Sequence, residues 1–122
     1  MTKEQMYVNV AKDLIEAYDL DFGNAEAYIQ DGCLYGSIEA PNNSIIDFSV
    51  KKIKAETPVQ CRKEIMQAMI DAMRNFEPDV GFSEVWLPYF SNHTDISPFE
   101  FMLEEDVSHF SDTADRMEKE TL

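Results

Sequence analysis

Residues 25–53 read AEAYIQDGCLYGSIEAPNNSIIDFSVKKI, and the architecture of the chain follows from this stretch. Three runs in it have strand-like composition: 25–30, 33–40 and 45–53. Asp31-Gly32 between the first two runs is the strongest short signal for a hairpin, and the turn-forming residues PNNS at 41–44 separate the second run from the third. The stretch therefore predicts three strands joined by short turns.

Side chains alternate along these runs. In the third run Ile46, Phe48 and Val50 share one face and polar residues lie between them, while in the second run Leu34 and Ile38 share a face. Alternation indicates a sheet with one covered face and one solvated face. We therefore predict an antiparallel meander.

Helical patterns flank the three runs. Thr2 and Gln5 fit a capping box, and the apolar stripe behind them predicts a helix over roughly residues 3–18. Pro58 occupies the favoured first position of a second helix, expected over roughly residues 58–76. The Met-rich stripe of this second helix favours core packing, with an adaptable binding groove as the alternative.

After residue 76 the pattern predicts shorter helices. The aromatic stretch 82–90 is compatible with a short helix, and apolar residues keep helical spacing from Phe99 to Met117. The predicted fold is a single α+β domain over residues 1–122. It has an N-terminal helix, a three-stranded antiparallel sheet, then a long helix and shorter C-terminal helices packed on one face.

The composition of the chain excludes several classes of protein. With 122 residues and 44% hydrophobic content the chain can build a core, and no stretch of eighteen apolar residues predicts a transmembrane helix. Its N-terminus has no signal-peptide pattern, so we expect a cytoplasmic protein. Cys33 and Cys61 are too few for a disulfide framework, and each is expected to be a buried or half-buried thiol.

The net charge is −14. Such a protein repels nucleic acid and anionic membranes, and it attracts basic protein surfaces. The charge is uneven: residues 1–76 carry −4, with twelve acidic and eight basic side chains, whereas residues 77–122 carry −10, with twelve acidic and two basic.

Carboxylates crowd the last predicted helix. If its apolar stripe faces inward, six of them form a solvated partner-binding surface: Glu100, Glu104, Glu105, Asp106, Asp112 and Asp115. Like charges at helical spacing repel one another, and a Lys/Arg-rich partner would relieve that repulsion. The alternative is a face that only solubilises the protein.

Two aromatic residues in the stretch 82–90 are candidate anchors for a partner. Trp86 and Tyr89 belong to the types favoured at interface hot spots, and core packing is the alternative.

Signals for catalysis are weak. The sequence has four glycines and no phosphate-binding loop or nucleophile-elbow motif. His109 follows Glu105 by four residues and Asp106 by three, so the three could share a helix face as metal ligands do. One histidine among many carboxylates arises readily by chance. We predict no enzyme, no cofactor and no functional metal.

Four short motifs stand out in the C-terminal half: NFEPD at 75–79, EVW at 84–86, SP at 97–98 and LEED at 103–106. Together, over residues 72–117, they resemble a pattern in small acidic proteins carried by phages and mobile elements of Firmicutes. Size, acidity and this context also resemble anti-CRISPR and anti-restriction inhibitors that act as DNA mimics.

The resemblance implies an inhibitor of a host nucleic-acid-dependent defence complex, such as a type II RNA-guided nuclease, acting in the bacterial cytoplasm. Its expected partner is a basic protein surface, with no direct contact to nucleic acid or membrane. The alternative is a structural or adaptor protein of a mobile element, acting as a homodimer through its aromatic and Met-rich surface.

Overall fold

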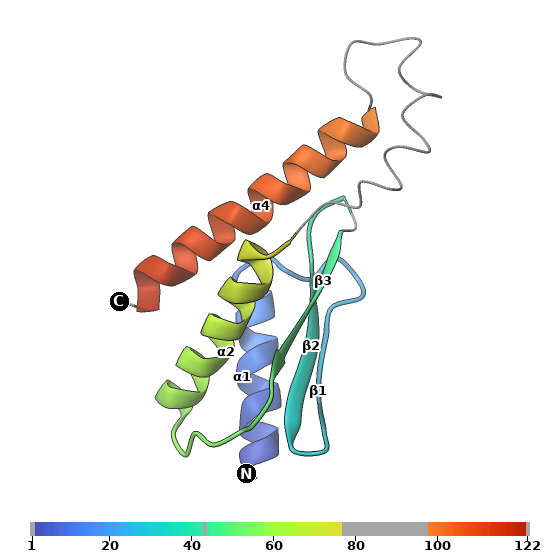
Figure 1. Ribbon diagram of the computed structural model, residues 1–122. Helices are drawn as coiled ribbons and strands as arrows, with labels where there is room; N and C mark the ends of the chain where they lie inside the picture. Colours follow the sequence, from blue (N-terminus) through green and yellow to red (C-terminus); the bar gives the residue numbers. More distant parts are fainter. Residues whose placement is uncertain (1, 43, 77–97, 122) are drawn as a thin grey trace.

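The computed structural model describes the backbone of residues 2–42, 44–76 and 98–121, and the side chains of residues 2–42, 44–76 and 104–120. The elements in chain order are α1 (Lys3–Ala17), β1 (Glu26–Gln30), β2 (Cys33–Glu39), β3 (Ile45–Val50), α2 (Pro58–Arg74) and α4 (Pro98–Thr121). This order confirms the predicted α+β class, with a helix, an antiparallel three-stranded sheet and then helices (Figure 1).

The predicted hairpin joins β1 to β2. Gln30 pairs with Cys33 across a two-residue turn in which Asp31 has φ 52° and Gly32 has φ 76°. Positive φ at both central residues matches the right-handed twist of the strands. Glycine adopts this conformation without a steric penalty and Asp tolerates it, which explains why this dipeptide sets the register.

The sheet is a meander in the order β1-β2-β3, as predicted. Its inner face buries Leu34 and Ile38 from β2 and Phe48 from β3. Gly36 pairs with Phe48, and a Cβ atom on Gly36 would overlap the Phe48 ring. A glycine is therefore required where the aromatic ring crosses β2.

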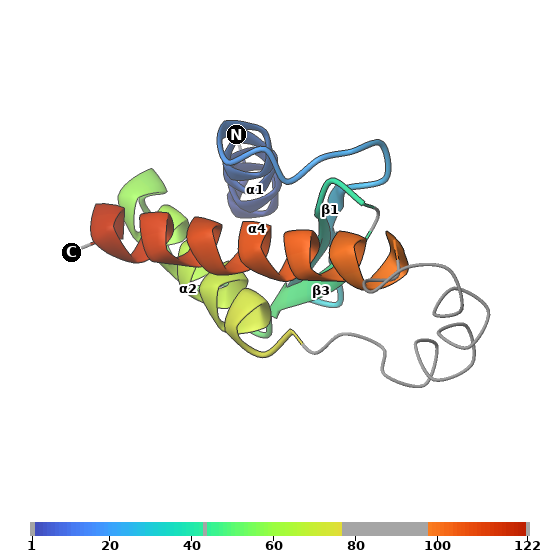
Figure 2. The same ribbon diagram turned by 90° about the horizontal axis from the view of Figure 1, so that it is seen from above.

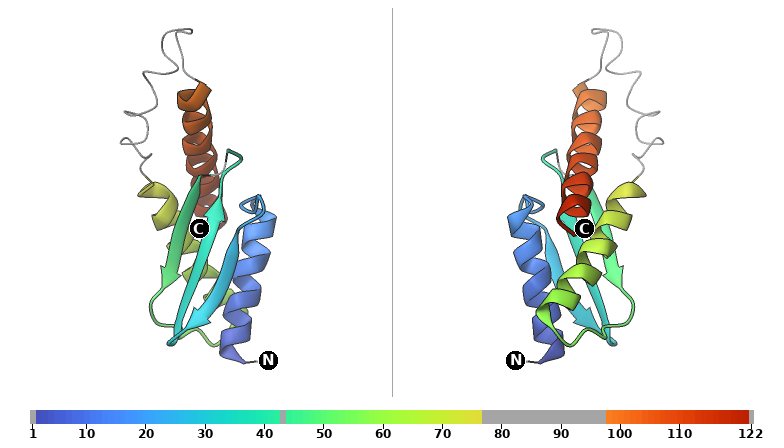
Figure 3. Two further views of the ribbon diagram at one scale, coloured as in Figure 1. Left: turned by 90° about the vertical axis from the view of Figure 1, so that its right-hand side faces the viewer. Right: turned by 90° about the vertical axis from the view of Figure 1, so that its left-hand side faces the viewer.

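Helices α1 and α2 cover this inner face (Figure 3), whereas the opposite face is open at Tyr28 and Tyr35 and covered at Glu39 by the loop between α1 and β1. At the start of α1, the Gln5 N–H donates to Thr2 Oγ1 over 3.1 Å and the Thr2 N–H donates to Gln5 Oε1 over 3.0 Å, so the capping box is confirmed. The methionine stripe of α2 is buried in the core: Met66, Met69 and Met73. Core packing is therefore confirmed for this stripe, and a Met-lined binding groove is not.

Two details of the predicted C-terminal region were wrong. α4 is one continuous helix of 24 residues, longer than the 17 residues of α2, because no glycine or proline interrupts it after Pro98. It packs on α2 rather than on the sheet, and it forms an outer layer that crosses above α1 and α2 (Figure 2).

A buried tyrosine stabilises the connection between β3 and α2 through hydrogen bonds. The Tyr7 hydroxyl on α1 donates to Glu64 Oε2 over 2.7 Å and accepts from the N–H groups of Lys54 (3.1 Å) and Ala55 (2.8 Å). Burial and the hydrogen bond to Glu64 raise the pKa of Tyr7. The hydroxyl thereby satisfies two backbone donors that would otherwise lack a partner.

A buried carboxylate stabilises the loop between α1 and β1 through hydrogen bonds. Glu39 Oε1 accepts from the N–H groups of Phe22 (3.0 Å) and Asn24 (2.7 Å), and the side chain is fully buried. Burial disfavours its charge, but these backbone hydrogen bonds outweigh burial and lower the pKa of Glu39 below its ordinary value. The loop is consequently held across one end of the sheet.

Candidate functional site

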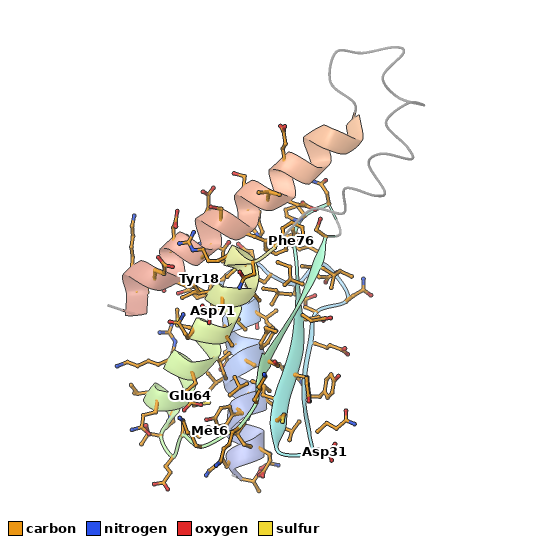
Figure 4. The ribbon with its side chains drawn as sticks, in the orientation of Figure 1. Met6, Tyr18, Asp31, Glu64, Asp71 and Phe76 are labelled. Atoms are coloured by element: carbon orange, nitrogen blue, oxygen red, sulfur yellow. The ribbon has the colours of Figure 1, made fainter. Side chains whose placement is uncertain are left out.

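The packing of α4 against the rest of the protein determines which of its carboxylates are exposed to solvent. Phe110, Ala114 and Met117 are buried, and the Phe110 ring meets Phe76 edge-on at 5.1 Å between centroids. Figure 4 places Tyr18 and Phe76 where α4 crosses α2, and the Arg116 guanidinium lies 5.1 Å from the centroid of the Tyr18 ring. The apolar stripe therefore faces inward, as predicted for this part of the helix.

Four predicted carboxylates are exposed, and three of them lie together: Glu104, Glu105 and Asp112. They border an open hollow of about 430 Å³, whose other lining residues are Pro41, Ser108 and His109. Of the described residues that line it, none is a lysine or arginine. On α4, Glu104 and Asp112 are separated by about 12 Å, at 1.5 Å per residue.

The prediction for Asp106 was wrong. Its side chain is 1% exposed, and its two carboxylate oxygens accept from the N–H groups of Asn42 (2.9 Å) and Ser44 (3.2 Å). Asp106 therefore caps the β2–β3 turn from inside and is not part of a solvated surface. Helical periodicity could not reveal this, because the donors are backbone groups more than sixty residues earlier in the chain.

Asp115 is exposed but has a partner within the protein. Arg74 at the end of α2 reaches Asp115 Oδ1 over 2.6 Å and Glu118 Oε1 over 3.0 Å. Hydrogen bonds to these two carboxylates raise the pKa of Arg74. Asp115 thus serves as an inter-helix contact and is a poor candidate for binding a second basic group.

A second acidic hollow lies between the end of α1 and the start of β1. It has a volume of about 460 Å³ and is lined by Lys12, Ile15, Glu16, Asp19, Asp21, Ala25 and Glu26. His109 joins the two hollows, since its Nε2 lies 3.1 Å from the Asp19 carbonyl oxygen and its ring meets Phe22 at 6.0 Å between centroids. Residues 90 positions apart in the chain are thereby in contact, and this contact connects the linings of the two hollows.

We call this region the acidic surface, defined by Glu104, Glu105 and Asp112 of α4 together with Glu16, Asp19 and Asp21 at the end of α1. Sequence reasoning missed the second group. The signal that could have revealed it is the pair of carboxylates Asp19 and Asp21, directly after the first predicted helix. Periodicity along one helix cannot show that another helix ends beside it.

His109 does not gather a metal-binding group. Its predicted neighbours diverge, because Glu105 is exposed and Asp106 turns inward. Within the described residues no cluster of three or more His, Cys, Asp or Glu side chains has the arrangement of a metal site.

The side chains of three further predicted site residues are not among those that the structure describes. Glu100 lies in the first turn of α4, where only the backbone is described. Trp86 and Tyr89 lie outside the described residues altogether.

The two cysteines are separate thiols. Cys61 is buried, which raises its pKa to about 11, and Cys33 is half-buried with its Sγ 2.8 Å from the Lys51 carbonyl oxygen. These environments confirm the predicted burial.

Among the described helices, none is long and apolar enough to cross a membrane.

No protein-family model, curated protein or solved structure matches this chain. The acidic surface must therefore be interpreted from its own geometry.

Proposed function

We propose that this protein is a non-enzymatic inhibitor that binds a basic protein surface through the acidic surface. In this proposal it acts in the cytoplasm of a bacterial host, where it blocks DNA binding by a nucleic-acid-dependent defence complex such as a type II RNA-guided nuclease. Its carboxylates would take the place of DNA phosphates against lysine and arginine side chains.

The observation that carries the proposal is the junction between His109 and Asp19. It connects α4 with the segment that follows α1, and seven acidic side chains line the two hollows on either side of this contact when Glu26 is included. A surface that only solubilises the protein needs no such convergence of two segments.

Electrostatics favours a basic partner. Carboxylates crowded on one surface repel one another, and in the part of the chain that the structure describes Lys12 is the one lysine or arginine that lines the two hollows. Lysine and arginine from a partner would relieve this repulsion and accelerate association at low salt. A partner that normally holds DNA phosphates carries such side chains.

Competition with DNA tests the proposal. A guide-loaded type II nuclease would be mixed with fluorescently labelled target duplex and increasing amounts of this protein. We expect stoichiometric loss of bound duplex and no turnover of either partner. Retention of the duplex at saturating protein would contradict this choice of target.

The matched control keeps the charge change constant. The variant E104Q/E105Q/D112N removes three carboxylates of the acidic surface, and D13N/E56Q/D71N removes three exposed carboxylates elsewhere. Displacement of DNA should weaken in the first variant and persist in the second. Equal weakening would mean that net charge alone acts.

The alternative, an adaptor homodimer, has lost part of its support because the Met-rich stripe of α2 is buried. A sizing column distinguishes the two proposals. A dimer without affinity for basic proteins would favour the adaptor.

A further inference from the structure

The open face of the sheet carries a pair of stacked tyrosines. Tyr28 of β1 is directly opposite Tyr35 of β2, with ring centroids 5.8 Å apart and ring planes inclined by 29°. The two side chains are 44% and 38% exposed. Tyrosine is enriched at binding hot spots because it offers a large, rigid apolar area with a polar tip.

Two carboxylates flank this pair on one side. Glu26 precedes Tyr28 by two residues, so both side chains point to the same face about 7 Å apart. Across the sheet Glu26 pairs with Ser37, and Ser37 pairs with Asp47, so the two carboxylates lie about 10 Å apart on one row. The residue between them is a small, buried serine.

The charges on this face are separated. Glu26 and Asp47 are exposed and lie on one side of the tyrosine pair. Lys51 and Lys52 follow β3 at the hairpin end of the sheet, on the other side of the pair, where two lysines and Asp31 of the turn give a formal net charge of +1. The row of Glu26 and Asp47 is therefore complementary to a cation that also contacts a tyrosine ring.

We propose that this face binds an arginine-bearing segment of a partner protein, with the guanidinium group packed on the tyrosine pair and paired with Glu26 or Asp47. Guanidinium is planar, stacks on aromatic rings and donates two parallel hydrogen bonds to a carboxylate. A lysine ammonium matches the charge of this site but not its flat shape.

Charge also argues against other occupants. A second copy docked on this face would bring together two proteins that each carry a net charge of −14, which opposes association. A nucleic acid could stack bases on the tyrosines, but its phosphates would meet these carboxylates. Glu26 also lines the hollow beside α1, but the sheet face lies opposite α1 and α2 and away from α4, so the tyrosine pair is separate from the carboxylates of α4 (Figure 3).

The test uses two nine-residue peptides, one alternating arginine with glycine and one alternating lysine with glycine. Each is titrated into the ¹⁵N-labelled full chain carrying E104Q/E105Q/D112N, which weakens binding at the acidic surface. The arginine peptide should bind about two- to fivefold tighter than the lysine peptide, as expected for a cation–π contact at an exposed site. The largest amide shifts should cluster at Tyr28, Tyr35 and Glu26.

Two variants of the pair isolate the aromatic contribution. In Y28S/Y35T the two peptides should bind with equal affinity. Y28F/Y35F keeps the aromatic rings, so it should still bind the arginine peptide more tightly than the lysine peptide. Equal affinity of the two peptides for the starting protein would overturn the proposal, as would shifts confined to α4. Shifts at Tyr28 and Tyr35 that depend on protein concentration alone would identify a second copy as the occupant and overturn it too.

Discussion

The carboxylate of Asp106 accepts a hydrogen bond from the backbone N–H of Asn42 over 2.9 Å, joining α4 to a turn 64 residues earlier in the chain. Its other oxygen accepts from the N–H of Ser44 over 3.2 Å, and the same turn is closed by the Ala40 N–H donating to the Ser44 carbonyl oxygen over 2.9 Å. This buried anchor lies next to Glu105 in sequence. It therefore helps to fix where the exposed carboxylates of α4 lie.

Removal of this anchor should destabilise the protein. Asp106→Ala leaves two N–H groups of the turn without their acceptor, which costs about 1–3 kcal/mol. Urea unfolding followed by circular dichroism measures the change. Glu105→Ala, at the exposed neighbouring position, is the control and should change the free energy of unfolding by less than about 0.5 kcal/mol. Equal effects of the two substitutions would show that Asp106 is not an anchor.

Gly36→Ala should destabilise the sheet. The added methyl group overlaps the Phe48 ring, so the ring or the strand must move, at a cost of about 1–3 kcal/mol. Thermal unfolding gives the comparison, with Ser49→Ala on the open face of the sheet as the control. An unchanged melting temperature for Gly36→Ala would mean that the Phe48 ring does not lie against β2.

Stability should fall in acid partly because of Glu39. The pKa of Glu39 is lower in the folded protein than in the unfolded chain, so its contribution is fully present above the unfolded-state pKa. That contribution is lost as the pH falls through the folded-state pKa. Urea unfolding between pH 7 and pH 3 should show a smaller acid-induced loss for Glu39→Gln than for the native protein. Glu26→Gln, at an exposed position, is the control for the loss of one carboxylate.

The Tyr7 hydroxyl should stabilise the connection between β3 and α2. Tyr7→Phe removes the acceptor for the N–H groups of Lys54 and Ala55 and should cost about 1–3 kcal/mol. Faster amide exchange at Lys54 and Ala55 would accompany the loss. Tyr28→Phe is the matched control, because the Tyr28 side chain is exposed on the sheet. If neither substitution changes the free energy of unfolding, the Tyr7 hydroxyl does not stabilise this connection.

Local signals predicted most of the described fold. Asp31-Gly32 specified its own turn, and Thr2 specified the start of α1, because both act on backbone groups within three residues. Alternation in β3 also predicted which face is buried. Each of these features depends on neighbours in the sequence.

Long-range partners could not be predicted in this way. Asp106 has the spacing of a surface residue, but its hydrogen-bond donors come from a distant turn. The junction of His109 with Asp19 likewise depends on how α4 crosses the end of α1, which no periodicity reveals. The sequence therefore predicted the acidic character of α4, but not the carboxylates that complete the acidic surface.

The most direct test of the central claim is the affinity for the guide-loaded nuclease at low and high salt, measured for the native protein and for E104Q/E105Q/D112N. At low salt, loss of three charge pairs at about 0.5 kcal/mol each predicts roughly tenfold weaker binding by this variant. Its salt dependence should also be shallower than that of the native protein. Affinity that does not change with salt in the native protein, or that is the same in the variant, would contradict the account.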